Sequence, residues 1–223
     1  MNEIDGRCLK LQHPFCMMVS GPTMCGKTNW VSRLVEFKET MIDPPPQRVI
    51  WSYKNWQPSY DTMIKKHEIN FISGLNIPFN ENKIPTLVIV DDQMNMIDDR
   101  VVDWFTRGCH HDNISLIFIT QNLFFPDKKF RTASLNCHYL VLFRNPRDNH
   151  QVRHLARQMY PGKRSQSMIE AFEDATSCTP YGVLVVDLKP TTPDCLRLRS
   201  NILPEEGLQF PEDANGLSHC YLI

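Results

Sequence analysis

The chain has 223 residues, which is long enough for one domain with a sizeable hydrophobic core. Its 24 basic and 25 acidic side chains nearly cancel, and the net charge of −1 excludes a global basic field for nucleic acid. Eight scattered cysteines form no Cys-x-x-Cys pair, which argues against a zinc ribbon or thioredoxin motif and suits a reducing compartment. With no signal peptide or membrane-length apolar stretch visible, we expect a soluble, intracellular protein without membrane contact.

The first unit predicted along the chain is a strand, a glycine-containing loop and a helix. The apolar run 15–19 has the length of a strand, and apolar residues recur at helical spacing over 30–35. Residues 21–28 lie between them and fit the P-loop pattern G-x-x-x-x-G-K-[ST]. The residues predicted to surround phosphates are therefore Gly21, Pro22, Thr23, Met24, Cys25, Gly26, Lys27 and Thr28.

The residue types of this loop suit the phosphates of a nucleoside triphosphate. Glycines let the backbone curl closely around an anion, and the N-terminus of the following helix adds a favourable field. Lys27 can reach the β- and γ-phosphates, and the Thr28 hydroxyl can bind Mg²⁺. The alternative is a chance match in a turn, but the strand–loop–helix context favours an ATP and Mg²⁺ site.

Residues 43–85 contain a break and two weaker elements. The prolines at 44–46 interrupt the chain, and the β-branched and aromatic stretch 48–53 predicts a second strand. A short helix is expected over 58–67 and a brief strand over 69–72. A loop is expected over 74–85 because glycine, asparagine, proline and lysine are mixed there.

Two aspartates follow a run of four aliphatic residues in the stretch 86–92. Such a run predicts a central parallel strand buried on both faces, and the acids at its end match the Walker B pattern. Asp91 is predicted to hold the Mg²⁺ shell and Asp92 to polarise the attacking water. Aspartate is shorter than the glutamate that many ATPases carry here, so the role of Asp92 stays open. Paired acids can also cap a turn, but the upstream P-loop favours the functional interpretation.

A helix predicted over 98–107 ends at Gly108 and carries Arg107 in its last turn. A cation there complements the helix dipole, or it can be an arginine finger for the ATP of a neighbouring subunit. The residues alone leave both roles open. His110 and His111 are adjacent and point apart, without a third ligand at suitable spacing, which argues against a metal site.

The buried strand predicted over 115–120 is followed by two amides, Gln121 and Asn122. Either amide could sense the γ-phosphate or orient water, and either could instead satisfy backbone groups of a loop. We assign the sensor role to Gln121 and keep Asn122 as the alternative.

The remaining elements complete an alternating pattern. After a loop that extends to Lys129, a strand is expected over 139–143. Apolar residues at helical spacing over 152–159 predict a helix there, and a second helix is expected over about 165–176. Segments 182–187 and 196–199 predict a hairpin, the second with period-2 alternation, and the tail from Pro204 resembles a loop. We therefore expect one ATPase domain over 1–203 and a flexible tail over 204–223.

Alternating strands and helices predict an α/β fold with a mostly parallel central sheet flanked by helices and a C-terminal β-hairpin. In such sheets ligands bind beyond the carboxyl ends of the strands. The P-loop, the acids Asp91 and Asp92, and Gln121 each follow a predicted strand. They are therefore expected to converge on one edge of the sheet.

Nine Lys and Arg residues lie between 128 and 164, in a chain that is neutral overall. Such a cluster can follow a phosphate backbone, although most charge runs are solvated surfaces. The candidate DNA contacts are Lys128, Lys129, Arg131, Arg153 and Arg157.

The ordered motifs resemble the FtsK–HerA superfamily of DNA-pumping ATPases. A more specific resemblance is to the genome-packaging ATPases of large and medium DNA viruses and of Maverick/Polinton-type elements, the poxvirus-like group. It covers about 15–203 and depends on segments 21–28, 87–92, 105–111, 117–124, 139–146 and 156–162.

The resemblance implies an ATPase ring, pentameric or hexameric, that drives double-stranded DNA into a preformed capsid through a capsid or portal-vertex protein. It implies a host nucleus, a cytoplasmic viral factory or the virion as its place of action. It implies the roles assigned above to Lys27, Thr28, Asp91, Asp92 and Gln121, and it favours Arg107 as an arginine acting in trans. The departure from the superfamily is Asp92 in place of glutamate.

Other functions remain as alternatives. A viral-type thymidine kinase has a similar loop, but the paired-cysteine zinc site of that family is missing. A regulatory GTPase is disfavoured because no N-K-x-D motif occurs. A non-packaging translocase or helicase of the same superfamily and a non-hydrolysing scaffold with a structural nucleotide site stay open.

Overall fold

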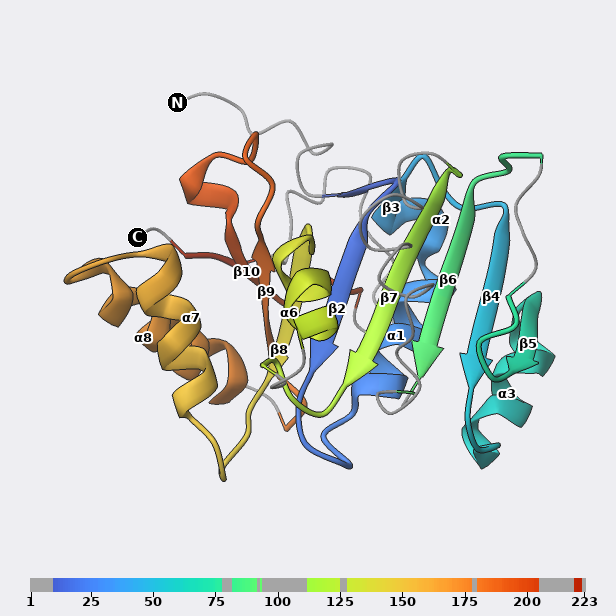
Figure 1. Ribbon diagram of the computed structural model, residues 1–223, viewed down its shortest axis with the longest axis horizontal. Helices are drawn as coiled ribbons and strands as arrows, with labels where there is room; N and C mark the ends of the chain where they lie inside the picture. The colour runs from blue at the N-terminus through green and yellow to red at the C-terminus, as the bar shows by residue number, and fades with distance from the viewer. Residues whose placement is uncertain are drawn as a thin grey trace.

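The computed structural model describes residues 10–77, 82–91, 93, 112–124, 128–177, 180–204 and 219–221. Its main feature is a nine-stranded sheet, seen face-on in Figure 1. From one edge to the other the strands are β11 (His219–Cys220), β10 (Leu198–Ser200), β9 (Val183–Asp187), β8 (Tyr139–Phe143), β2 (Cys16–Ser20), β7 (Ile114–Thr120), β6 (Thr86–Asp91), β4 (Arg48–Tyr53) and β5 (Ile69–Ser73).

The sheet is parallel from β8 through β2, β7, β6 and β4 to β5. Strands β9, β10 and β11 continue it in antiparallel fashion beyond β8. A separate two-stranded sheet pairs β1 (Leu11–Gln12) with β3 (Ile42–Asp43). The predicted α/β fold, with a mostly parallel sheet and a C-terminal hairpin, is confirmed.

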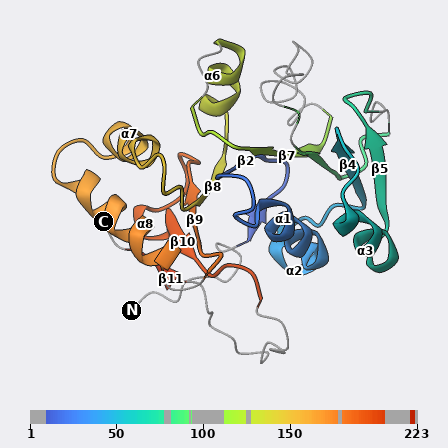
Figure 2. The same ribbon diagram turned by 90° about the horizontal axis from the view of Figure 1, so that it is seen from below.

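Helices cover both faces of the sheet and create two cores. On one face lie α1 (Lys27–Glu36) and α3 (Pro58–Lys66), with the short α2 (Lys38–Met41) after α1. On the other face lie α7 (His150–Met159) and α8 (Arg164–Ser177). Figure 2 shows α6 (Lys128–Leu135) and α7 on the opposite side of the sheet from α1 and α2. Both faces of the central strands are therefore buried, which explains their near-continuous aliphatic sequences.

Several sequence expectations need correction. Helix α6 begins at Lys128, where a loop was expected, and residues 219–220 form a strand within the predicted loop-like tail. The hairpin strands are 183–187 and 198–200, separated by a 3₁₀ turn, η4 (Asp194–Leu196). Short elements of this kind depend on tertiary pairing more than on local propensity, so the sequence pattern gave little signal for them. The helix predicted over 98–107 lies outside the described residues.

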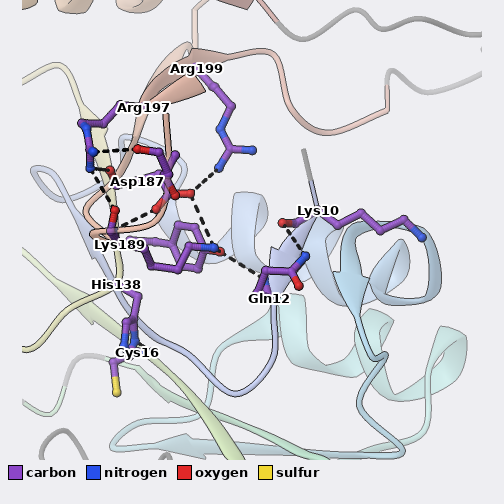
Figure 3. A network of polar contacts seen from close by, with 10 residues as sticks. Lys10, Gln12, Cys16, His138, Asp187, Lys189, Arg197 and Arg199 are labelled. Carbon is purple, nitrogen blue, oxygen red and sulfur yellow. Dashed lines mark hydrogen bonds and ion pairs between the residues drawn. The ribbon is translucent and has the colours of Figure 1, made fainter. Parts of the chain in front are cut away.

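A buried polar network joins β8, β9 and β10 (Figure 3). The Asp187 carboxylate lies 3.4 Å from a guanidinium nitrogen of Arg199, and both side chains are almost fully buried. Lys189 Nζ lies 3.6 Å from the same carboxylate and donates to the Tyr139 hydroxyl at 2.5 Å. Burial raises the pKa of that phenol, which therefore stays neutral. The alternation over 196–199 thus does not place Arg199 in solvent, because β11 and Asp187 enclose it.

Replacing Arg199 by methionine is expected to leave the buried Asp187 carboxylate without its guanidinium partner. We predict a loss of about 3 kcal/mol in the free energy of unfolding, measured by urea titration. Arg153→Met on the exposed surface of α7 is the matched control, with an expected change within about 0.5 kcal/mol. Equal losses for the two variants would contradict a stabilising role for the Asp187–Arg199 pair.

Candidate nucleotide-binding site

Two glycines allow the loop between β2 and α1 to curl, for different reasons. Gly26 has a φ of 97°, a left-handed conformation that residues with a Cβ rarely adopt. Gly21 lies against the end of β8, where an added Cβ would be 2.6 Å from Phe143 Cβ and 2.7 Å from Cys25 Sγ. The G-x-x-x-x-G-K-[ST] spacing therefore corresponds to a steric requirement at Gly21 and to a conformational one at Gly26.

Within this loop, Lys27 Nζ donates to the carbonyl oxygens of Gly21 and Pro22, at 2.7 Å each. These acceptors are neutral, and a phosphate oxygen is a stronger acceptor for an ammonium group. Burial raises the pKa of the adjacent Cys25 thiol despite the nearby Lys27 charge, so this thiol stays protonated at neutral pH. The geometry suits an anion-binding lysine and does not suit a cysteine nucleophile.

Thr28 and Asp91 are 63 positions apart in the sequence and are hydrogen-bonded in the fold. Thr28 Oγ1 donates to Asp91 Oδ2 at 3.2 Å. Asp91, the last residue of β6, is only 3% exposed. A hydroxyl and a carboxylate side by side are the hard oxygen ligands that Mg²⁺ prefers. The donor set therefore fits a Mg²⁺ ion held by Thr28 and Asp91.

Tyr60, which no sequence motif marks, also donates to Asp91 Oδ2, at 2.9 Å. Its ring is fully buried on α3, among Trp51, Tyr53 and Phe71, with centroid distances of 5.2 to 5.8 Å. The packed ring fixes the hydroxyl, and the hydroxyl orients the carboxylate. No spacing rule in the sequence links a tyrosine at the start of one helix to an aspartate at a distant strand end.

Gln121 belongs to the same site as the P-loop. A cavity of about 890 Å³ is lined by Lys27, Thr28, Asp91, Thr120 and Gln121 together with residues of α1 and α3. Asn122 does not line this cavity.

The side chain of Asn122 instead accepts a hydrogen bond from Gln151 Nε2 at 3.5 Å. Gln151 Oε1 in turn accepts from the backbone N–H of Leu123, at 2.6 Å. Asn122 is thus tied to α7, and the arrangement favours Gln121 as the amide that faces a nucleotide.

The remaining candidates are distributed differently. Asp92, Arg107, His110 and His111 lie outside the described residues. Arg131 on α6 and Arg153 and Arg157 on α7 have exposed side chains, and Lys128 and Lys129 belong to the first turn of α6. Within the described ranges, no group of three or more His, Cys, Asp or Glu residues could hold a metal ion.

The geometry and the sheet together define the fold. It is that of a P-loop NTPase. The phosphate loop joins a central strand to a covering helix. Asp91 ends β6, and Gln121 directly follows the neighbouring strand β7. In the part of the chain that the structure describes, no helix is both long and apolar enough to cross a membrane.

Comparisons with known proteins found matches among solved structures. No family model and no curated protein matches the chain. Among solved structures, the chain is similar to the genome packaging NTPase B204 from Sulfolobus turreted icosahedral virus 2, solved in complex with ATP-gammaS. The identity is 12%, the match covers 78% of this chain and 92% of that chain, and the TM-score is 0.49. This likeness is too distant to assign a function, which must come from the residues themselves.

If Asp91 is a Mg²⁺ ligand, Tyr60→Phe is expected to weaken Mg²⁺ binding, because it removes the hydroxyl and keeps the buried ring in place. Loss of one hydrogen bond to a charged acceptor predicts an increase of about tenfold in the Mg²⁺ concentration that half-saturates nucleotide binding. The measurement is a fluorescent ATP analogue titrated at a series of Mg²⁺ concentrations.

The matched control for Tyr60→Phe is Tyr53→Phe, whose ring packs against Tyr60 in the same aromatic cluster. It should leave the Mg²⁺ requirement unchanged. An unchanged requirement in Tyr60→Phe as well would show that the hydroxyl does not position Asp91.

Proposed function

We propose that this protein is a Mg²⁺-dependent ATPase. The observation that supports this most directly is the hydrogen bond from Thr28 to Asp91, because it joins the P-loop to the acid of the Walker B pattern. Lys27 and Gln121 line the same cavity as that pair. A volume of about 890 Å³ lies within the range of about 300–1,000 Å³ that is typical of ligand pockets.

Each residue of the site has a proposed role. Lys27 exchanges its two carbonyl partners for phosphate oxygens, and Thr28 and Asp91 hold the metal. Mg²⁺, when bound, neutralises charge on the β- and γ-phosphate oxygens. Gln121 contacts the γ-phosphate or the attacking water, and Asp92 polarises that water. The nucleotide occupies the cavity at the carboxyl ends of the strands, and the buried Asp91 stays fixed.

We further propose that hydrolysis is coupled to translocation of double-stranded DNA during genome packaging into a capsid. This rests on the ordered resemblance to packaging ATPases, from the P-loop to segment 156–162. The proposal includes a homo-oligomeric ring in which Arg107 reaches the ATP of a neighbouring subunit, and a capsid or portal-vertex protein as partner. Exposed arginines on α6 and α7, on one side of the sheet, offer phosphate contacts (Figure 2).

The test of this function is steady-state ATP hydrolysis with and without linear double-stranded DNA at low salt. We expect turnover that requires Mg²⁺, rises with DNA and disappears in Lys27→Ala. Turnover that is indifferent to DNA, together with phosphorylation of a nucleoside, would contradict the packaging function and favour a nucleoside kinase. Full turnover in Lys27→Ala would place the site elsewhere.

Reversing the charges of Arg153 and Arg157 on α7 is expected to weaken DNA binding equally for all sequences. Each phosphate contact contributes about one to the slope of log affinity against log salt, so the slope should fall by about two. Fluorescence anisotropy with labelled duplexes over a salt series measures both effects.

The matched control for this pair is Lys54→Glu with Lys65→Glu, two exposed lysines near and on α3. These changes alter the net charge equally and should leave the slope nearly unchanged. An equal loss of DNA affinity in both double variants would show that the α7 arginines act through net charge alone and do not contact DNA.

A further inference from the structure

A second cavity of about 340 Å³ lies beside the P-loop and is separate from the cavity that contains Lys27 and Asp91. It forms where β8 ends, α8 ends and β9 begins. Because β9 is antiparallel to β8, its first residues lie at the same edge of the sheet as the end of β2. Cys25, Phe143, Arg144 and Tyr181 are among the residues that line it.

Tyr181 lines this cavity and also the larger cavity that contains Lys27 and Asp91. Its ring packs against the phosphate loop, since a Cβ added at Gly26 would lie 3.0 Å from Tyr181 Cδ1. The side chain is nevertheless 64% exposed, so much of the ring faces away from the core. An exposed aromatic face beside a cavity is a surface on which a planar base can stack.

The order of the strands determines where Tyr181 lies relative to Asp91. Asp91 ends β6 and Gln121 directly follows β7, and both strands lie on one side of the P-loop strand β2. Tyr181 precedes β9, on the other side of β2 beyond β8. Asp91 and Tyr181 thus lie on opposite sides of the P-loop strand, so one nucleotide bound along the loop can contact both.

We infer that Tyr181 and the 340 Å³ cavity form the nucleobase site of this protein, with the Tyr181 ring stacked on a purine. The inference rests on the proposed function, because it takes the terminal phosphates to lie at Lys27 and Asp91. Arg144, exposed at the wall of the cavity, adds N–H donors for the nucleoside. The P-loop backbone and Tyr181 thus bind different parts of one ligand.

A ligand with phosphates but no base separates the two contributions. Dissociation constants for ATP and for inorganic tripolyphosphate, both with Mg²⁺, are measured by titration calorimetry in wild type and in Tyr181→Ala. We expect Tyr181→Ala to raise the dissociation constant of ATP about tenfold, as for the loss of one stacked base. The dissociation constant of tripolyphosphate should stay unchanged. Tyr181→Trp should retain ATP affinity, and its fluorescence should respond to ATP but not to tripolyphosphate.

Leu135→Ala, which removes a 72% exposed side chain from α6, is the control and should bind both ligands like wild type. An equal loss of affinity for both ligands in Tyr181→Ala would show that the ring only stabilises the loop, and this would overturn the inference. Unchanged ATP affinity would place the base elsewhere. Lys27→Ala should weaken the binding of both ATP and tripolyphosphate. Unchanged binding of both ligands in Lys27→Ala would contradict the proposed function instead.

Discussion

The site depends on one buried carboxylate. Asp91 Oδ2 accepts hydrogen bonds from Thr28 and Tyr60, which come from the helices α1 and α3 on the same face of the sheet. A carboxylate that is 3% exposed is costly to bury unless it is hydrogen-bonded, so these donors are a condition of the fold as well as of the site. The same interaction fixes the start of the P-loop helix relative to the sheet.

The register of the parallel strands brings the other groups to this carboxylate. Ser20 pairs with Thr120, and Asp91 pairs with Ile119, so β2, β6 and β7 end within about one residue of each other. The antiparallel strands then extend the sheet on the side of β8, where the buried Asp187–Arg199 pair joins β9 to β10. This extension brings Tyr181 to the edge that carries the P-loop.

The sequence could predict that Lys27, Thr28, Asp91 and Gln121 lie at one cavity, because the signals for these residues are local. Glycines in a P-loop reflect the local need for a tight turn, and an aliphatic run before an acid reflects a buried strand. A parallel sheet then brings the ends of such segments together. Tyr60 and Tyr181 could not be predicted, since their contacts depend on how α3 packs and where β9 begins. The burial of Arg199 could not be predicted either, because the alternation of its segment does not show that Asp187 and β11 cover it.

Thr28 and Asp91 are proposed to complete one Mg²⁺–nucleotide site with the P-loop. The most direct measurement is the rise in melting temperature caused by ATP, with Mg²⁺ and with EDTA, in wild type and in Asp91→Asn. We expect a larger rise with Mg²⁺ in wild type. In Asp91→Asn, which retains the ATP effect through Lys27, we expect no difference between Mg²⁺ and EDTA. An undiminished effect of Mg²⁺ in Asp91→Asn would contradict this proposal.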